Sequence, residues 1–316
     1  AASFSKKSAI RASAESREPW LREAFQRIED LLAGARQLRR GERPSEYEER
    51  CRAELDVLYG AHDDALQRWQ GLLDRRDGSG ISQVFAPPIR RQIVWTYLAR
   101  VGRRWAKLPS KDLRRSIDLL EQNITEEPGD DRSTRLWIQG ARYINPTPSL
   151  DSAIEKTAYW KANSNSIDAC YYLYVMYAIQ GLSGLSLAAE RSMRELEETR
   201  ARARYRRDRS FSFEWFGPGC DLAKMVHHDD LGAWSEQKGF WDRDDKLSRV
   251  QGIVVSISGP QAGEIELSAG LKAFFVPGSC GITKARDENA YVTCFVGFSY
   301  DGLRAWSVQR VDAPPE

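Results

Sequence analysis

Histidine and paired cysteine are scarce in this sequence. The chain has 3 histidines among 316 residues, and its 5 cysteines are far apart, without a Cys-x-x-Cys pair. A disulfide framework or a cysteine-based zinc site needs clustered ligands, so neither is predicted. The dispersed cysteines favour a reducing, cytoplasmic setting.

Long apolar runs are missing as well. No stretch approaches the roughly 18 to 20 consecutive apolar residues that a membrane-spanning helix needs, so no membrane partner is predicted. The hydrophobic share of 41% and the charged share of 29% are typical of a globular protein, and the length allows two domains. Residues 1–14 are basic and rich in serine and alanine, a pattern found in polar arms and in transit peptides. We expect residues 1–18 to form a flexible arm.

Motifs of common enzyme classes are also absent. The sequence has no Gly-rich loop with Gly-Lys-Ser/Thr, no Gly-x-Ser-x-Gly elbow and no Gly-x-Gly-x-x-Gly fingerprint. A Cys–His nucleophile pair could combine Cys220 or Cys280 with His227, although no recognisable motif surrounds these residues. We predict that the chain is not an enzyme on its own and uses no cofactor, and a hidden enzyme stays open as a third alternative.

Two short His/Asp segments raise the question of a metal site. They are His62-Asp63 and the run from His227 to Asp230. We expect the second segment to be helical, which places the side chains of His227 and His228 on different helix faces, where they do not share a metal ion easily. The sequence therefore predicts no metal site.

Apolar residues follow a helical period through the first two thirds of the chain. A stripe with alternating steps of three and four residues covers 20–38, and Ser45 with Glu48 forms a capping box that opens a second helix. Further helices are predicted in pairs at 93–105 with 113–124, 132–144 with 149–161, and 167–180 with 185–199. These pairs predict a helical domain over residues 19–210.

Small residues recur at one place in the second helix of each pair. Ser116, Ala153 and Ala188 are 37 and 35 residues apart, and small residues at such a period allow two helices to approach closely. Residues 46–199 resemble the tetratricopeptide-repeat superfamily in this respect. The pattern departs from that family in the tyrosine-rich run Tyr171–Tyr177. The resemblance implies an antiparallel helical-repeat scaffold that binds protein segments.

The period changes to that of strands after residue 211. Residues 211–246 are expected to form a short, partly helical connector, and five short strands are predicted within residues 247–316. Gly252, the segments AGEIEL and AFFVP, and the closing VTCFVGFSYDGLRAWSV are similar to a cold-shock-type OB domain. The predicted fold class is therefore α+β, mainly α, with helix pairs followed by a five-stranded antiparallel OB-like barrel.

Cold-shock-type domains stack bases on aromatic residues of their second and third strands. Here Ala262 and Glu264 stand where the family has the second-strand aromatics, and Pro277 stands in place of a histidine. Phe275 matches the third-strand aromatic and is the one barrel residue that we retain as a nucleic-acid candidate. The barrel is thus expected to keep the fold and to bind oligonucleotides weakly or not at all.

Positive charge is concentrated in front of the barrel. Residues 211–316 hold 10 Lys and Arg against 15 Asp and Glu, a net charge of −5, which leaves +7 for residues 1–210. A run of arginines supplies the densest basic candidates for phosphate contact: Arg200, Arg202, Arg204, Arg206, Arg207 and Arg209. The alternative interpretation of this run is a solvated helix surface.

These observations predict a non-catalytic protein-binding scaffold or regulatory subunit. A helical-repeat region joined to a degenerate OB barrel is similar in architecture to proteins of bacterial regulatory and antiviral defence systems. That likeness implies a protein partner such as a protease, an NTPase or a nuclease effector. The alternative is a nucleic-acid-binding protein that uses its basic helical surface.

Overall fold

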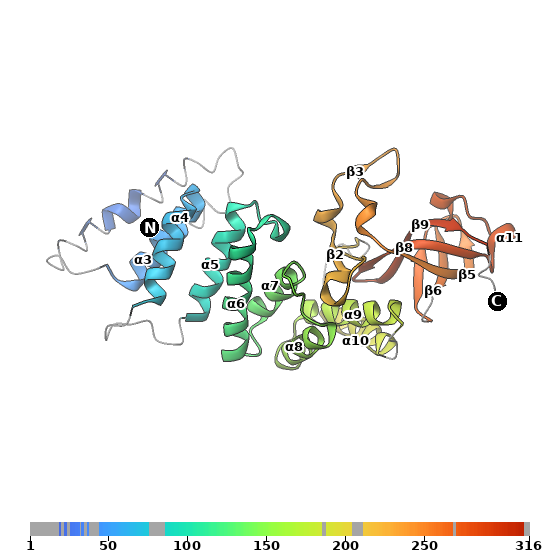
Figure 1. Cartoon of the computed structure of the whole chain (residues 1–316), viewed down its shortest axis with the longest axis horizontal. Coiled ribbons are helices and arrows are strands. Elements are labelled where there is room, and N and C mark those ends of the chain that lie inside the picture. Colours follow the sequence, from blue (N-terminus) through green and yellow to red (C-terminus); the bar gives the residue numbers. More distant parts are fainter. Residues whose placement is uncertain are drawn as a thin grey trace. The chain divides into compact units, whose positions relative to one another are not determined.

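The computed structural model describes residues 44–75, 86–184, 188–203, 211–267 and 270–312, together with some positions between 19 and 37. For residues 199–203 only the backbone is described. The expected arm, residues 1–18, lies outside the described residues. The chain divides into two compact units, residues 1–123 and 124–316. The predicted helical region and the predicted five-stranded barrel are both present (Figure 1).

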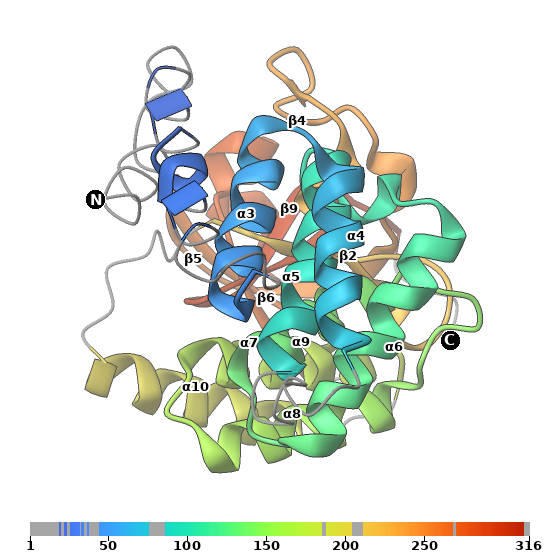
Figure 2. The ribbon, with the colours of Figure 1, turned by 90° about the vertical axis from the view of Figure 1, so that its left-hand side faces the viewer.

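The first unit is helical. Helices α3 and α4 pack side by side, and α4 packs against α5 (Figures 1 and 2). Asn123 near the end of α6 donates a hydrogen bond to the Pro87 carbonyl at the start of α5, so these two helices run antiparallel. The helices that belong wholly or mostly to this unit are α3 Glu46–Tyr59, α4 His62–Leu73, α5 Ala86–Arg100 and α6 Ser110–Glu126.

Four further helices open the second unit: α7 Asp131–Ala141, α8 Leu150–Asn163, α9 Ile167–Leu182 and α10 Ala189–Ala203. Hydrogen bonds between their opposite ends show that neighbours are antiparallel. Trp160 Nε1 in α8 lies 3.0 Å from Asp131 Oδ1 in α7. Gln180 Nε2 in α9 lies 2.8 Å from Asp151 Oδ1 in α8. The helices predicted for this region are thus present in their expected order.

Local signals in the sequence fix several helix starts. The predicted capping box is confirmed, because the Ser45 side chain accepts the Glu48 N–H while the Glu48 carboxylate accepts the Ser45 N–H. Ser116 and Ala153, two of the three periodic small residues, are fully buried. The third, Ala188, precedes α10 and is half-buried.

A closed barrel forms the end of the second unit. Its five strands are β5 Arg249–Gly259, β6 Ala262–Leu267, β7 Lys272–Phe275, β8 Tyr291–Ser299 and β9 Gly302–Arg310. The ring closes in the order β5-β6-β7-β9-β8, since β8 pairs with both β5 and β9. This order is compatible with the predicted barrel.

The expected all-antiparallel arrangement is wrong. Strands β7 and β9 pair in parallel, with Phe274 opposite Arg304, and the other four pairs of the ring are antiparallel. The reason is geometric: strand directions cannot alternate all the way around a closed ring with an odd number of strands. A five-stranded closed barrel therefore contains at least one parallel pair.

The segment expected to be a helical connector also contains strands. Strand β1, Glu214–Phe216, pairs with β8, and β2, Met225–His227, pairs with β1, so both extend the barrel sheet. A separate hairpin pairs β3, Trp234–Ser235, with β4, Phe240–Trp241. The short 3₁₀ helices between them are η3 Asp221–Lys224, η4 His228–Leu231 and η5 Asp244–Lys246.

One buried carboxylate holds the connection between β7 and β8. Asp287, at the end of α11 (Lys284–Asp287), is fully buried and accepts the Thr283 N–H at 2.7 Å. Arg286 and Arg310 lie 3.3 Å and 3.2 Å from its Oδ1. The backbone hydrogen bond and these two cations hold the pKa of Asp287 below its usual range.

We predict that Asp287→Asn lowers the melting temperature at pH 7. A carboxylate with a depressed pKa in the folded state stabilises the fold above the unfolded pKa, about 3.9, and loses that contribution as the pH falls through the folded value. The difference between wild type and variant, followed by thermal unfolding, should therefore shrink below about pH 4. An equal difference at pH 7 and at pH 3 would contradict this role.

Candidate functional site

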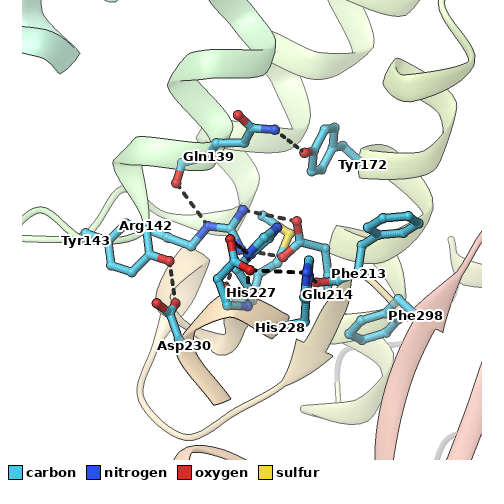
Figure 3. A network of polar contacts seen from close by, with 12 residues as sticks. Gln139, Arg142, Tyr143, Tyr172, Phe213, Glu214, His227, His228, Asp230 and Phe298 are labelled. Carbon is cyan, nitrogen blue, oxygen red and sulfur yellow. Dashed lines mark hydrogen bonds and ion pairs between the residues drawn. The ribbon is translucent and has the colours of Figure 1, made fainter. Parts of the chain in front are cut away.

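A buried ion pair joins helix α7 to the sheet. Arg142 directly follows α7 and Glu214 lies in β1, and their side chains are 3% and 2% exposed. The contact is bidentate, with Arg142 Nη1 on one carboxylate oxygen and Nη2 3.2 Å from the other (Figure 3). Burial lowers the pKa of Arg142, but the Glu214 carboxylate together with the neighbouring Tyr143 and Tyr172 outweighs this effect, so the pKa lies above its ordinary value.

Two further N–H groups of the guanidinium donate to backbone carbonyls. Arg142 Nε donates to the Gln139 carbonyl at 3.2 Å, and Nη1 donates to the Met225 carbonyl in β2 at 3.0 Å. The neighbouring Tyr143 hydroxyl donates to Asp230 in η4 (Figure 3). One end of α7 is therefore tied to β1, β2 and η4 at once.

Helix α9 is attached to the same sheet through its tyrosines. The Tyr171 hydroxyl donates to the Phe298 carbonyl in β8 at 3.1 Å, and its ring stacks on Tyr300 at a centroid distance of 4.3 Å. The Tyr300 hydroxyl donates to Asp168 at the start of α9. The tyrosine-rich run that departs from the repeat pattern is thus the surface that packs on the barrel.

We predict that Arg142→Ala and Glu214→Gln each lower the free energy of unfolding by about 3–5 kcal/mol, because each leaves a buried group without its partner. The double variant Arg142→Met/Glu214→Leu should recover most of this loss, since it removes both buried groups and fills the volume. Urea unfolding measures the three values. A double variant no more stable than the singles would show that the ion pair itself is required.

The barrel carries a pocket on the outer side of β7 and β9. Its volume is about 340 Å³, and its walls come from the β3–β4 hairpin, from β7 with the turn after it, and from β9. Trp234 and Phe274 in these walls are 46% and 38% exposed. The aromatic, basic and thiol side chains that line the pocket are Trp234, Lys238, Phe274, Cys280, Arg304 and Trp306.

Two donors at this pocket lack acceptors. Arg304 Nε and Trp306 Nε1 are buried atoms without a hydrogen-bond partner in the described structure. The Arg304 guanidinium lies 5.0 Å from the centroid of the Phe274 ring, which follows from the pairing of these two residues across β7 and β9. A buried donor without an acceptor costs about 1–3 kcal/mol, so an oxygen of a bound molecule is the natural partner.

An irregular strand shapes one wall of the pocket. Between Trp306 and Gln309 strand β9 has one residue more than the paired stretch of β8, and Ser307 has a left-handed backbone with φ 48°. Arg249 secures this bulge by donating to the Ser307 carbonyl at 3.1 Å. Bulges redirect side chains and are frequent beside functional sites, and a non-glycine residue at positive φ is strained there.

Phe275, the aromatic residue chosen from the sequence, does not line the surface as expected. Its side chain is 1% exposed and lies beneath Gly263, where a Cβ atom would come within 2.4 Å of the ring. Its neighbour Phe274 is the outward aromatic of β7. The alternation of side chains along a strand places only one of two consecutive residues on each face, and the sequence match selected the inner one.

The arginine run is placed only in part. Arg200 and Arg202 belong to the backbone of α10, but their side chains lie outside the described residues, as do Arg204, Arg206, Arg207 and Arg209 altogether. Their contact with phosphate stays a prediction. One other basic residue on a helix is already neutralised, because Arg100 in α5 forms ion pairs with Asp63 and Asp112.

His227 and His228 do not lie on different faces of one helix, so the obstacle predicted against a shared metal ion is wrong. The two residues lie at the junction of β2 and η4 rather than on an α-helix, and their ring centroids are 4.3 Å apart. Burial lowers the pKa of His227. Cys280, one of the two candidate nucleophiles, lies in the barrel pocket with its sulfur 3.5 Å from Ser279 Oγ.

No helix in the described part of the chain is long and apolar enough to cross a membrane. The chain matches no protein-family model, no curated protein and no solved structure at a significant level.

Proposed function

We propose that this chain is a non-catalytic recognition subunit whose barrel pocket holds a short segment of a protein partner. The observation that carries the proposal is the pocket with two unpaired donors, Arg304 Nε and Trp306 Nε1, between aromatic walls. An extended peptide presents carbonyl oxygens to such donors and an apolar side chain to such walls. Tryptophan and arginine are the residues that most often dominate the energy of protein interfaces.

Charge favours a peptide over a polyanion as the occupant. Residues 211–316, which include the hairpin and the barrel, carry a net charge of −5, and Glu264 lies on β6 opposite Phe274. Lys238 and Lys272 at this face are paired with Asp244 and Glu264 at 3.6 Å and 2.9 Å. A nucleic-acid strand would gain little from cations that are already neutralised.

The attachment of α7 and α9 to the sheet supports a scaffold role. The helices and the barrel share a buried ion pair and several buried hydrogen bonds, so the pocket is built on a pre-organised body. Pre-organisation reduces the entropy that binding must overcome. We propose that the helix pairs are repeats of the tetratricopeptide type and that the barrel is of the OB type, and that the partner is an effector protein.

The second candidate function is binding of single-stranded nucleic acid. It is favoured by one observation, the exposed Phe274 ring beside the Arg304 guanidinium, because bases stack on such pairs. The arginine run on α10 and beyond would supply the backbone contacts.

Peptide display on the intact chain, followed by calorimetry with the selected peptides, tests the first proposal. We expect Trp234→Ala and Arg304→Gln to weaken binding by about 2 kcal/mol each, roughly thirtyfold in Kd, as for other interface hot spots. Trp95→Ala and Arg132→Gln are matched controls, because both residues are exposed on helices that contribute no residue to the pocket lining. These controls should leave the Kd unchanged.

Two outcomes would overturn the proposal. Selected peptides that bind equally well to the wild type and to both pocket variants would place recognition elsewhere. Single-stranded oligonucleotides that bind with micromolar affinity at physiological salt, and lose affinity in Arg304→Gln, would establish the second candidate instead.

A further inference from the structure

Three side chains with metal-binding atoms converge at the outer edge of the sheet. His227 ends β2, and His228 and Asp229 begin η4. Their potential ligand atoms all lie within 4.8 Å of one another, and the two histidines lie next to the Arg142–Glu214 pair (Figure 3). The cluster is outside the barrel pocket and has no part in the proposed recognition function.

The Asp229 carboxylate lies within reach of both rings. Its Oδ2 is 3.4 Å from His227 Nδ1, and its Oδ1 is 3.2 Å from His228 Nε2. In a tetrahedral zinc site with bonds of about 2.0–2.1 Å, ligand atoms are about 3.3–3.4 Å apart. Each imidazole therefore already lies at about this distance from one oxygen of the Asp229 carboxylate.

Hydrogen bonds indicate which ring nitrogen of each histidine carries a lone pair. His227 Nδ1 accepts the Asp229 N–H at 3.2 Å, which requires this nitrogen to be unprotonated. His228 Nδ1 lies 3.4 Å from the Phe213 carbonyl, an acceptor that favours a proton on Nδ1 and a lone pair on Nε2. Nδ1 of His227 and Nε2 of His228 thus both carry lone pairs beside the Asp229 carboxylate, an arrangement that a bound cation stabilises.

The surroundings resemble the outer shell of a metal site. A ligating histidine usually donates its other N–H to a carbonyl or a carboxylate, as His228 does toward Phe213. The rings of Phe211 and Trp241 lie 5.1 Å and 6.1 Å from the His228 ring and cover it. The nearby Arg142 charge is neutralised by Glu214, and the exposed Asp229 leaves an entry for the ion and for water ligands.

We propose that His227, His228 and Asp229 bind a divalent transition-metal ion such as Zn²⁺, with water completing the coordination. Two imidazoles and one carboxylate suit Zn²⁺, Co²⁺ or Ni²⁺ and do not suit Mg²⁺ or Ca²⁺, which prefer oxygen ligands. The ion takes the Nδ1 lone pair of His227 from the Asp229 N–H, which is free to bind water instead.

Calorimetric titration of the intact chain with Zn²⁺ tests this site. We expect the wild type to bind one ion, and we expect His227→Gln, His228→Gln and Asp229→Asn each to weaken binding by about tenfold or more. His62→Gln is the matched control, because it removes the remaining histidine in the other compact unit. It should leave the affinity unchanged.

A second measurement separates this site from the exposed Cys220 and the other thiols. Co²⁺ bound at His227, His228 and Asp229 should give visible d–d absorption without a thiolate charge-transfer band. Near-ultraviolet circular dichroism of the metal-free variants should match the wild type, which excludes loss of folding as the cause. The proposal is overturned if the wild type does not bind Zn²⁺, if the three variants bind as the wild type does, or if the cobalt spectrum contains the thiolate band.

Discussion

The Arg142–Glu214 ion pair is the contact on which the second compact unit depends. Both side chains are almost fully withdrawn from water, and removing a charge from water costs several kcal/mol unless it is paired and hydrogen-bonded. The guanidinium meets this condition, because it contacts both carboxylate oxygens and two backbone carbonyls. These contacts are all made only when Arg142 and Glu214 face each other in this one arrangement, so the end of α7 has a fixed place against β1 and β2.

This constraint positions both proposed binding features. Strand β1 joins β2 to β8, and β8 forms part of the barrel wall, so the ion pair lies at one end of a continuous hydrogen-bonded sheet. His227 and His228 lie at its outer edge, beside the ion pair. The aromatic pocket lies over β7 and β9. The stacked Tyr171 and Tyr300 rings give a second point at which a helix is fixed to this sheet.

The sequence alone was sufficient for the order of the helices and of the five barrel strands, and insufficient for the strands within residues 211–246 and for the junctions between elements. Helices and strands follow from local periodicity, and the Ser45–Glu48 capping box was placed correctly because it depends on residues three apart. Glu214 is 72 residues from Arg142, and no local pattern connects them. One signal in the sequence does indicate a junction. The tyrosine-rich α9 is apolar on all sides, and such a helix is buried by other elements all round.

Errors in the predicted site have simple physical reasons. Phe275 was chosen in place of Phe274 because a match of aromatic letters does not establish which face of the strand each residue occupies. His227 and His228 were assigned to a helix, whereas β2 ends between them and brings their rings together. The pocket was not foreseen, because its walls come from the hairpin at 234–241 and from strands 30 or more residues further along the chain.

Native-state hydrogen exchange tests the central claim, that helices α7–α9 and the barrel sheet form one cooperative body. The account predicts that the slowest amides of α7 and α9 open with the same free energy as those of β1 and β8, because the elements share a buried ion pair and open together. A clearly lower opening free energy for the slowest helix amides than for the slowest strand amides would contradict this claim. The helices would then unfold while the barrel stays intact.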